Sequence, residues 1–190
     1  MKGKLLLFFF IFISFSSCSK EDDEVLTWEH PDVSFFKRIW NAAPHCAFTD
    51  LIEYNSKYYC CLREAEDHLP VNNSTYGKIR VLESVDGESW YSIGLVRDEN
   101  YDLRDPKFSI TANNQLMLSY GCSAFIDGQF GYRKNMFIYI FSNPEQNQPN
   151  FNHSQSFFIP VNQLLPTYWL WRIIWHQNQA YSIAYTFIYP

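Results

Sequence analysis

The sequence predicts an all-β fold, and three observations lead to this prediction. Phe, Trp and Tyr make up 19% of the 190 residues, whereas glycine occurs only 7 times, a composition that suits stacked β-sheets. No segment has the 3.6-residue apolar period of an amphipathic helix. Short runs of alternating polar and apolar residues, separated by polar turns, follow one another along most of the chain instead.

A strand-turn-strand unit recurs three times. The expected strands and turns are 50–54, Asn55-Ser56 and 57–63, then 106–111, Asn113-Asn114 and 115–121, then 172–176, Gln177-Asn178 and 179–185. The turns are 58 and then 64 residues apart, which suits a four-stranded propeller blade with loop insertions. Outer strands are expected at 77–84, 90–96, 136–141 and 156–160.

The third unit ends within or just after its second or third strand. We therefore expect an open, partial β-propeller of about two and a half four-stranded blades, at 45–97, 102–162 and 168–190. Such an array cannot close a ring. Its unpaired strand edges and its uncovered apolar blade face predict that the chain is only marginally stable by itself. We expect an N-terminal fragment of a longer propeller, cut by truncation or a frameshift. Pairing with another chain is the alternative.

The turn from Ser84 to Trp90 combines several local preferences. Gly87 can adopt a positive φ, Asp86 can accept hydrogen bonds from turn amides, and Trp90 can fold back over the turn. The spacing of these four residues resembles the Asp-box, a hairpin motif of sialidase-like β-propellers, in its form shorter by one residue. An ordinary Asp-Gly hairpin beside an aromatic residue is the alternative.

The first residues resemble a bacterial lipoprotein signal peptide, at 1–17. Two lysines precede an apolar run that is too short to span a bilayer, and Ser16-Ser17 leads into Cys18. The resemblance implies that Cys18 carries a lipid that anchors the exported chain to the outer membrane. An acidic tether and lead-in follow at 18–44, and its acidic start also resembles surface-export signals. A plain secretory signal with a chance cysteine is the alternative.

Composition and spacing argue against several partners. The chain has 15 basic and 20 acidic residues and no basic stripe, so nucleic acid is not expected as a partner. The remaining cysteines match no zinc-binding spacing and are expected to be buried free thiols, although export would also permit their oxidation: Cys46, Cys60, Cys61 and Cys122. The histidines have no ligand spacing, so a metal site is not expected, with a structural cation between loops as the alternative. No cofactor is expected.

The repeat places polar residues where each innermost strand begins. Asp50 occupies this place in the first unit, Arg104 and Asp105 in the second, and Trp171-Arg172 in the third. The second strand of the first unit ends in Arg63-Glu64, with His68 close behind. Since propeller ligands bind over the central channel, we expect these side chains to converge on one mouth.

Five segments together resemble the bacterial exo-α-sialidase-like family of β-propellers, from about His45 to Tyr185. They are His45–Leu51, Leu62–Glu64, Lys78–Val81, Arg104–Lys107 and Trp169–Arg172. The resemblance implies a six-bladed fold and a glycoside hydrolase that acts on a glycan or glycoconjugate. Sialidases bind the substrate carboxylate with three arginines, use an Asp as acid/base and attack with a Tyr that a Glu activates.

Carried over to this chain, the resemblance implies a role for each motif residue. Arg63, Arg104 and Arg172 are the candidates for carboxylate binding, since a guanidinium offers two N–H groups to two oxygens. Asp50 is the first choice for acid/base, with Glu64 or Asp105 as substitutes. The candidates for further sugar contacts are Trp169, Trp171 and His68.

The sequence also departs from the sialidase pattern. Ala47–Asp50 stands where sialidases carry Arg-Ile-Pro, and the nucleophilic Tyr and a further arginine would come from later blades. No turnover is therefore expected from this chain alone. A non-catalytic glycan-binding surface lipoprotein is the alternative function, and a scaffold for protein contacts is a third. Arg63-Glu64, Arg104-Asp105 and the two tryptophans also allow purely structural interpretations, as salt bridges and core.

Overall fold

The structure is a computed structural model that describes residues 37–126, 128–142, 145, 147–152, 154–156 and 168–185. The chain divides into two compact units, Met1–Arg38 and Ile39–Pro190. Of the first unit only Lys37 and Arg38 are described, and both are exposed. The predicted signal peptide and the lipidation at Cys18 lie outside the described residues. Everything below concerns the second unit.

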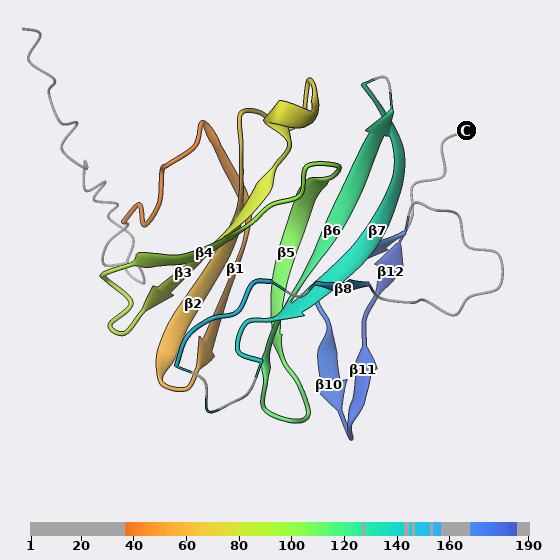
Figure 1. Ribbon diagram of the computed structural model, residues 1–190. Coiled ribbons are helices and arrows are strands. Elements are labelled where there is room, and N and C mark those ends of the chain that lie inside the picture. Colours follow the sequence, from red (N-terminus) through yellow and green to blue (C-terminus); the bar gives the residue numbers. More distant parts are fainter. Residues whose placement is uncertain are drawn as a thin grey trace, which may run out of the picture. The chain divides into compact units, whose positions relative to one another are not determined.

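The second unit is all-β in its described part, which confirms the predicted class. Two antiparallel sheets have four strands each, in chain order (Figure 1): β1 (His45–Tyr54), β2 (Lys57–Ala65), β3 (Lys78–Ser84) and β4 (Tyr91–Val96), then β5 (Asp102–Ile110), β6 (Leu116–Ile126), β7 (Gln129–Tyr139) and β8 (Gln155–Ser156). Two-stranded sheets pair β10 (Ile174–His176) with β11 (Gln179–Tyr181), and β9 (Trp169–Leu170) with β12 (Ala184–Tyr185).

None of these sheets closes on itself, and a short 3-10 turn, η1 (Asn73–Thr75), lies between β2 and β3. The division into propeller blades stays a prediction. Among the described residues, no helix has the length and apolar character needed to cross a membrane.

The three predicted turns are present, and their backbone conformations account for the residue types found in them. Asn55 and Ser56 both have positive φ, as do Gln177 and Asn178. Two consecutive left-handed residues match the right-handed twist of a hairpin, so β1 pairs with β2 and β10 with β11 across two-residue loops. Asn114 has a φ of 55° in the turn between β5 and β6.

The innermost strands begin earlier than the sequence predicts. β1 starts at His45 instead of Asp50, and β5 starts at Asp102 instead of Pro106. In each strand the pairing shifts at a bulge, between Ala47 and Asp50 in β1 and between Arg104 and Lys107 in β5. A bulge interrupts the alternation of polar and apolar side chains. The sequence pattern therefore indicates a strand that begins after the bulge, although the strand continues through it.

The third strand of the second sheet is also longer than predicted. β7 starts at Gln129, where the sequence predicts a start at Met136. Gly128 has a φ of 75° and allows the chain to reverse between β6 and β7. The first half of β7 carries polar residues on both faces, so its sequence lacks the alternation of polar and apolar residues that predicts a strand. Of the predicted strand 156–160, only Ser156 is described, in β8.

The predicted hairpin between β3 and β4 is present, and Asp86 holds its turn. One oxygen of Asp86 accepts hydrogen bonds from the amides of Glu88 and Ser89 at 2.9 and 2.7 Å, and from the Ser84 hydroxyl at 3.0 Å. These bonds lower the pKa of Asp86 to about 2. The Trp90 indole donates to the Gly87 carbonyl at 2.9 Å. The Asp-box-like residues therefore stabilise a turn.

One hydrophobic core joins the two large sheets. β5 lies next to β1 and β2 (Figure 1), and the shared core contains these buried side chains: Tyr54, Tyr59, Cys61, Ile79, Val81, Leu103, Phe108, Leu118 and Ile138. A second cluster lies on the opposite face of the first sheet, where Cys60, Leu62 and Leu82 pack with Trp40 and Trp90. The two cysteines of the Cys60-Cys61 pair thus point to opposite faces, as expected for neighbours in a strand.

We expect only Cys46 of the four described cysteines to react with a thiol reagent in the native protein. All four are free, but Cys46 is exposed whereas Cys60, Cys61 and Cys122 are buried. Burial raises the pKa of Cys60 to about 11 and that of Cys122 to about 12, so their thiolates are scarce at neutral pH. Peptide mass spectrometry after brief iodoacetamide treatment checks this, and unfolding in urea should expose the other three to labelling.

Candidate functional site

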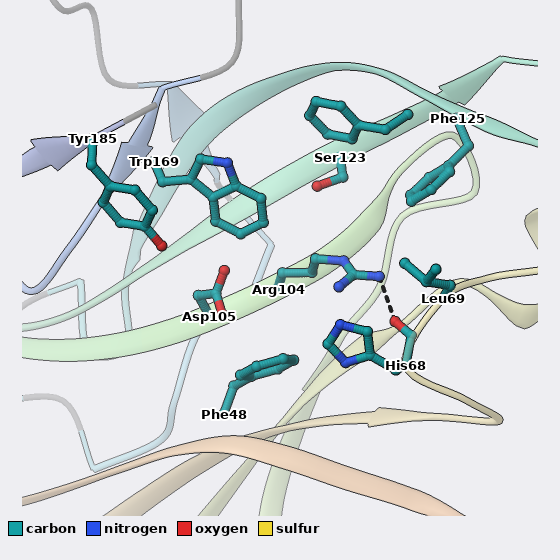
Figure 2. Close-up of a pocket in the computed structure, with 10 residues that line it drawn as sticks. Phe48, His68, Leu69, Arg104, Asp105, Ser123, Phe125, Trp169 and Tyr185 are labelled. Atoms are coloured by element: carbon teal, nitrogen blue, oxygen red, sulfur yellow. Dashed lines mark hydrogen bonds between the residues drawn. The ribbon is translucent and has the colours of Figure 1, made fainter. Parts of the chain in front are cut away.

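A cavity of about 330 Å³ lies where β5, β6 and β9 meet the connection between β2 and β3 (Figure 2). It is lined by Phe48, His68, Leu69, Arg104, Asp105, Ser123, Phe125, Phe130, Trp169 and Tyr185. A second cavity, of about 450 Å³, is lined by residues such as Leu95, Tyr120 and Phe151, and none of the predicted site residues lines it. The first cavity is therefore the candidate site.

The bulges of β1 and β5 place two side chains in this cavity. Phe48 follows Ala47 in the first bulge, and Asp105 follows Arg104 in the second, so the two occupy matching positions. Both have left-handed backbones, with φ of 56° and 50°. This conformation is strained for a phenylalanine, by roughly 1–3 kcal/mol, and such strain concentrates at functional sites. The bulges turn both side chains toward the cavity.

Asp102 is fully buried and joins two arginines. One carboxylate oxygen accepts a hydrogen bond from Arg63 Nη2 at 2.8 Å and another from the Gly77 amide. The other oxygen accepts from Arg104 Nε. Arg104 Nη2 in turn donates to the His68 carbonyl at 2.6 Å (Figure 2). Asp102 therefore orients Arg104, whose guanidinium lines the cavity.

Arg63 lies behind this site and does not line the cavity. Its side chain is fully buried, and its second Nη donates to the Asp67 carbonyl at 3.0 Å. A Cβ added at Gly77 would lie 2.3 Å from Arg63 Nε, so only glycine fits beside this guanidinium. Arg63 thus links β2 to β5 through Asp102. The structure assigns it contacts inside the protein, and its predicted role in carboxylate binding stays a prediction.

Arg133 on β7 is a site residue that the sequence did not predict. Its Nη2 donates to Asp105 at 3.1 Å, and its guanidinium carbon lies 3.5 Å from the Trp169 ring centre. A Cβ on Gly121 would lie 1.8 Å from Arg133 Nη2, so the guanidinium fills the space that this glycine leaves. Burial lowers the pKa of Arg133 to about 10. Only the pairing of β6 with β7 shows that Gly121 and Arg133 belong together.

Three buried side chains at or behind this site have unpartnered polar atoms. Nε and Nη1 of Arg133, Nε of Arg63 and the hydroxyl of Ser123 have no hydrogen-bond partner among the described residues. Ser123 pairs directly with Arg133 across β6 and β7 and lines the cavity. A buried donor without a partner costs roughly 1–3 kcal/mol, so such groups call for an explanation.

The buried charges around the cavity do not balance. The arginine cluster, which we define as Arg63, Arg104 and Arg133 with Asp102 and Asp105, carries three positive and two negative charges. Burial lowers the pKa of Arg104, and the neighbouring Asp102 opposes this shift, so the guanidinium keeps its proton at neutral pH. Counted over these five described residues alone, the net charge of the cluster is thus +1.

Asp50 and Arg172 form an ion pair with each other and do not line the cavity. The other oxygen of Asp50 accepts the Phe108 amide at 2.8 Å, which ties β1 to β5 just beyond the bulge. Lys107 donates to the Thr49 carbonyl at 3.2 Å, and its ammonium lies 5.6 Å from the Trp171 ring centre. Asp50 and Arg172, from the beginnings of the first and third repeat units, therefore form a polar cluster separate from the cavity, with Lys107 beside them.

Glu64 points to the opposite face of β2 from Arg63. It accepts two hydrogen bonds from Arg80, at 2.9 and 3.1 Å, and one from the Trp40 indole. The structure thus brings together four of the predicted site residues, His68, Arg104, Asp105 and Trp169. The expected convergence on one mouth does not extend to Glu64, Arg63, Asp50, Arg172 or the exposed Trp171.

His68 and Trp169 form opposite parts of the wall. The His68 ring lies 5.7 Å from the rings of both Phe48 and His45. Trp169 on β9 pairs with Tyr185 on β12, and their rings stack at 6.2 Å. Within the described residues, no three His, Cys, Asp or Glu side chains gather as metal ligands. The lining residues offer hydrogen bonding, charge and aromatic contact.

Comparisons with known proteins give no family for this chain. No family model, no curated protein and no solved structure matches the chain.

Proposed function

We propose that this protein is a sialidase-like surface lipoprotein that acts on glycans, and that the cavity around Arg104 binds an acidic sugar. The observation that carries the proposal is the net positive charge of the arginine cluster, of which Arg104 lines the aromatic-walled cavity while Arg63 and Arg133 lie behind it. The two sheets in chain order and the matching bulges support the blade interpretation of the fold.

An acidic sugar matches the chemistry of this cavity. The flat rings of Trp169, Tyr185 and Phe48 offer apolar surface to the C–H groups of a sugar ring. Asp105 can accept hydrogen bonds from sugar hydroxyls, and Arg104 can donate to a carboxylate. A carboxylate on the ligand would supply the negative charge that the cluster lacks. A neutral sugar would leave this charge uncompensated in a partly buried site.

Binding without cleavage is the activity that the contacts favour. A glycosidase needs a proton donor, yet Asp50 and Asp105 both accept hydrogen bonds from arginines. A tyrosine nucleophile needs activation, and the Tyr185 hydroxyl does point toward Asp105 (Figure 2). However, burial and the Asp105 charge raise the pKa of Tyr185, which opposes its use as a nucleophile. Hydrolysis through Tyr185 is therefore the second candidate.

Calorimetric titration of the full chain with methyl β-D-glucuronide and methyl β-D-glucoside tests the proposal. The two ligands differ in their carboxylate, so we expect the glucuronide to bind at least about tenfold more tightly. Arg104→Ala should remove this preference. Arg97→Ala, which changes an exposed arginine outside the cavity, is the matched control and should keep it.

Equal affinity for the two sugars, or no binding of either, would contradict the proposal. Incubation with 4-nitrophenyl β-D-glucuronide and with an aryl sialoside addresses cleavage, and we expect no release of the aryl alcohol. Release that Tyr185→Phe abolishes would favour the hydrolase over the binding protein.

A further inference from the structure

The candidate cavity has two chemically different ends (Figure 2). Asp105, Trp169 and Tyr185 form the polar end, where Tyr185 and Trp169 face the carboxylate. Leu69, Phe125 and Phe130 form the other end, which we call the apolar subsite. Arg104 lies between the two, with its guanidinium carbon 6.0 Å from the Phe125 ring centre. A ligand that fills the whole cavity therefore meets polar groups on one side and hydrocarbon on the other.

The apolar subsite is built mainly of aromatic rings from two neighbouring strands. Phe125 on β6 pairs with Phe130 on β7, and their rings meet edge to face at 6.1 Å and 79°. Tyr76 supports Phe125 from the connection before β3, at 6.3 Å between ring centres. Edge-to-face packing leaves ring edges and faces that suit a further aromatic ring.

Leu69 adds uncovered apolar surface at the mouth of the subsite. Leu69 is 60% exposed although it lines the cavity. A sugar ring carries hydroxyl groups around its rim, and these would lose their water against Leu69, Phe125 and Phe130 without gaining partners. The polar side chains nearest this end are Arg104 and His68, which Figure 2 draws beside Leu69, and Ser123. The three apolar side chains themselves offer no hydrogen-bond partner, so they favour an apolar group over a second sugar residue.

We propose that the apolar subsite binds an aromatic aglycone, carried by the acidic sugar that occupies the polar end. This inference rests on the proposed function, because the sugar positions the aglycone. The aglycone would cover Leu69 and complete the aromatic cluster, while the charged group of the sugar stays with Arg104. The ligand class that follows is an aryl glycoside of an acidic sugar.

The test compares phenyl β-D-glucuronide with methyl β-D-glucuronide by calorimetric titration of the full chain. The two probes carry the same sugar, so the ratio of their affinities reports the aglycone alone. We expect the phenyl compound to bind about tenfold more tightly, since its ring is removed from water in the subsite. Leu69→Ser and Phe130→Ser should each bring the ratio to within about twofold.

Val85→Ser is the matched control, because Val85 is 67% exposed on the hairpin between β3 and β4 and lines no part of the cavity. It should leave the ratio at about tenfold. Arg104→Ala should weaken both glucuronides together and leave the ratio in place. Leu69 lies in an exposed connection, so its replacement keeps the test independent of folding.

The outcomes separate this inference from the proposed function. If neither glucuronide binds, the proposed function fails and the inference fails with it. If both bind equally, the proposed function stands and the aglycone subsite is overturned. If the phenyl compound binds more tightly but Leu69→Ser and Phe130→Ser keep the ratio, the aryl group binds elsewhere and the inference is also overturned.

Discussion

Replacing Asp102 with asparagine is expected to lower the free energy of unfolding by roughly 3–5 kcal/mol, the largest effect of any single change proposed for this chain. Asp102 is fully buried and accepts hydrogen bonds from Arg63, Arg104 and the Gly77 amide. The asparagine side chain would keep one oxygen but lose the negative charge. Two buried guanidinium groups would then lie near each other without a shared counter-ion.

Urea unfolding followed by tryptophan fluorescence measures this change. Glu53→Gln is the matched control, because it removes an exposed carboxylate from β1, and it should stay within about 0.5 kcal/mol of the parent chain. A D102N variant as stable as E53Q would show that Asp102 does not hold the two arginines together. The assignment of Arg63 as a structural link would then fail as well.

Replacing Gly121 with alanine is expected to disrupt the site itself. The new Cβ would lie 1.8 Å from Arg133 Nη2, so the guanidinium must leave its place against Asp105 and Trp169. Overpacking of this kind lowers the free energy of unfolding by roughly 1–3 kcal/mol. The affinity for methyl β-D-glucuronide should fall by at least about tenfold, because Arg133 and Asp105 shape the polar end of the cavity.

Gly131→Ala serves as the matched control, since it also adds one methyl group, to β7. Its Cβ would meet the end of the flexible Ile126 side chain at 2.9 Å, which can move aside. Chemical denaturation and calorimetric titration of both variants provide the measurement. If G121A and G131A behave alike in stability and in binding, the packing of Arg133 over Gly121 is not what forms the site.

Much of the fold follows from local preferences that can be read from the sequence. The turns at Asn55-Ser56 and Gln177-Asn178 and the hairpin at Asp86-Gly87 occur where their residues predict, because left-handed backbone and side-chain capping are local properties. Strand ends at the bulges of β1 and β5 were placed wrongly. A bulge changes the side-chain alternation without ending the strand, so no local pattern marks it.

The site could be predicted only in part, because the sequence does not show which face of a strand each side chain occupies in the fold. Arg104 and Asp105 were named from their positions in the repeat, His68 because it follows Arg63-Glu64, and Trp169 from the sialidase resemblance. These four residues share one cavity. Glu64 was named beside Arg63, but neighbours in a strand point to opposite faces, and Arg80 and Trp40 hold it on the far side. The site roles that the sialidase resemblance implies stay predictions.

The sequence by itself determined the all-β class, the turns that join the strand pairs and the polar residues at the beginning of each repeat unit. These depend on contacts between residues close in the chain. Only the tertiary structure decided that Asp102 joins Arg63 to Arg104, that Arg133 lies over Gly121, and that Phe125 and Phe130 complete the cavity. The physical reason is that burial and charge pairing depend on which strands pack together, and that packing unites residues far apart in the chain.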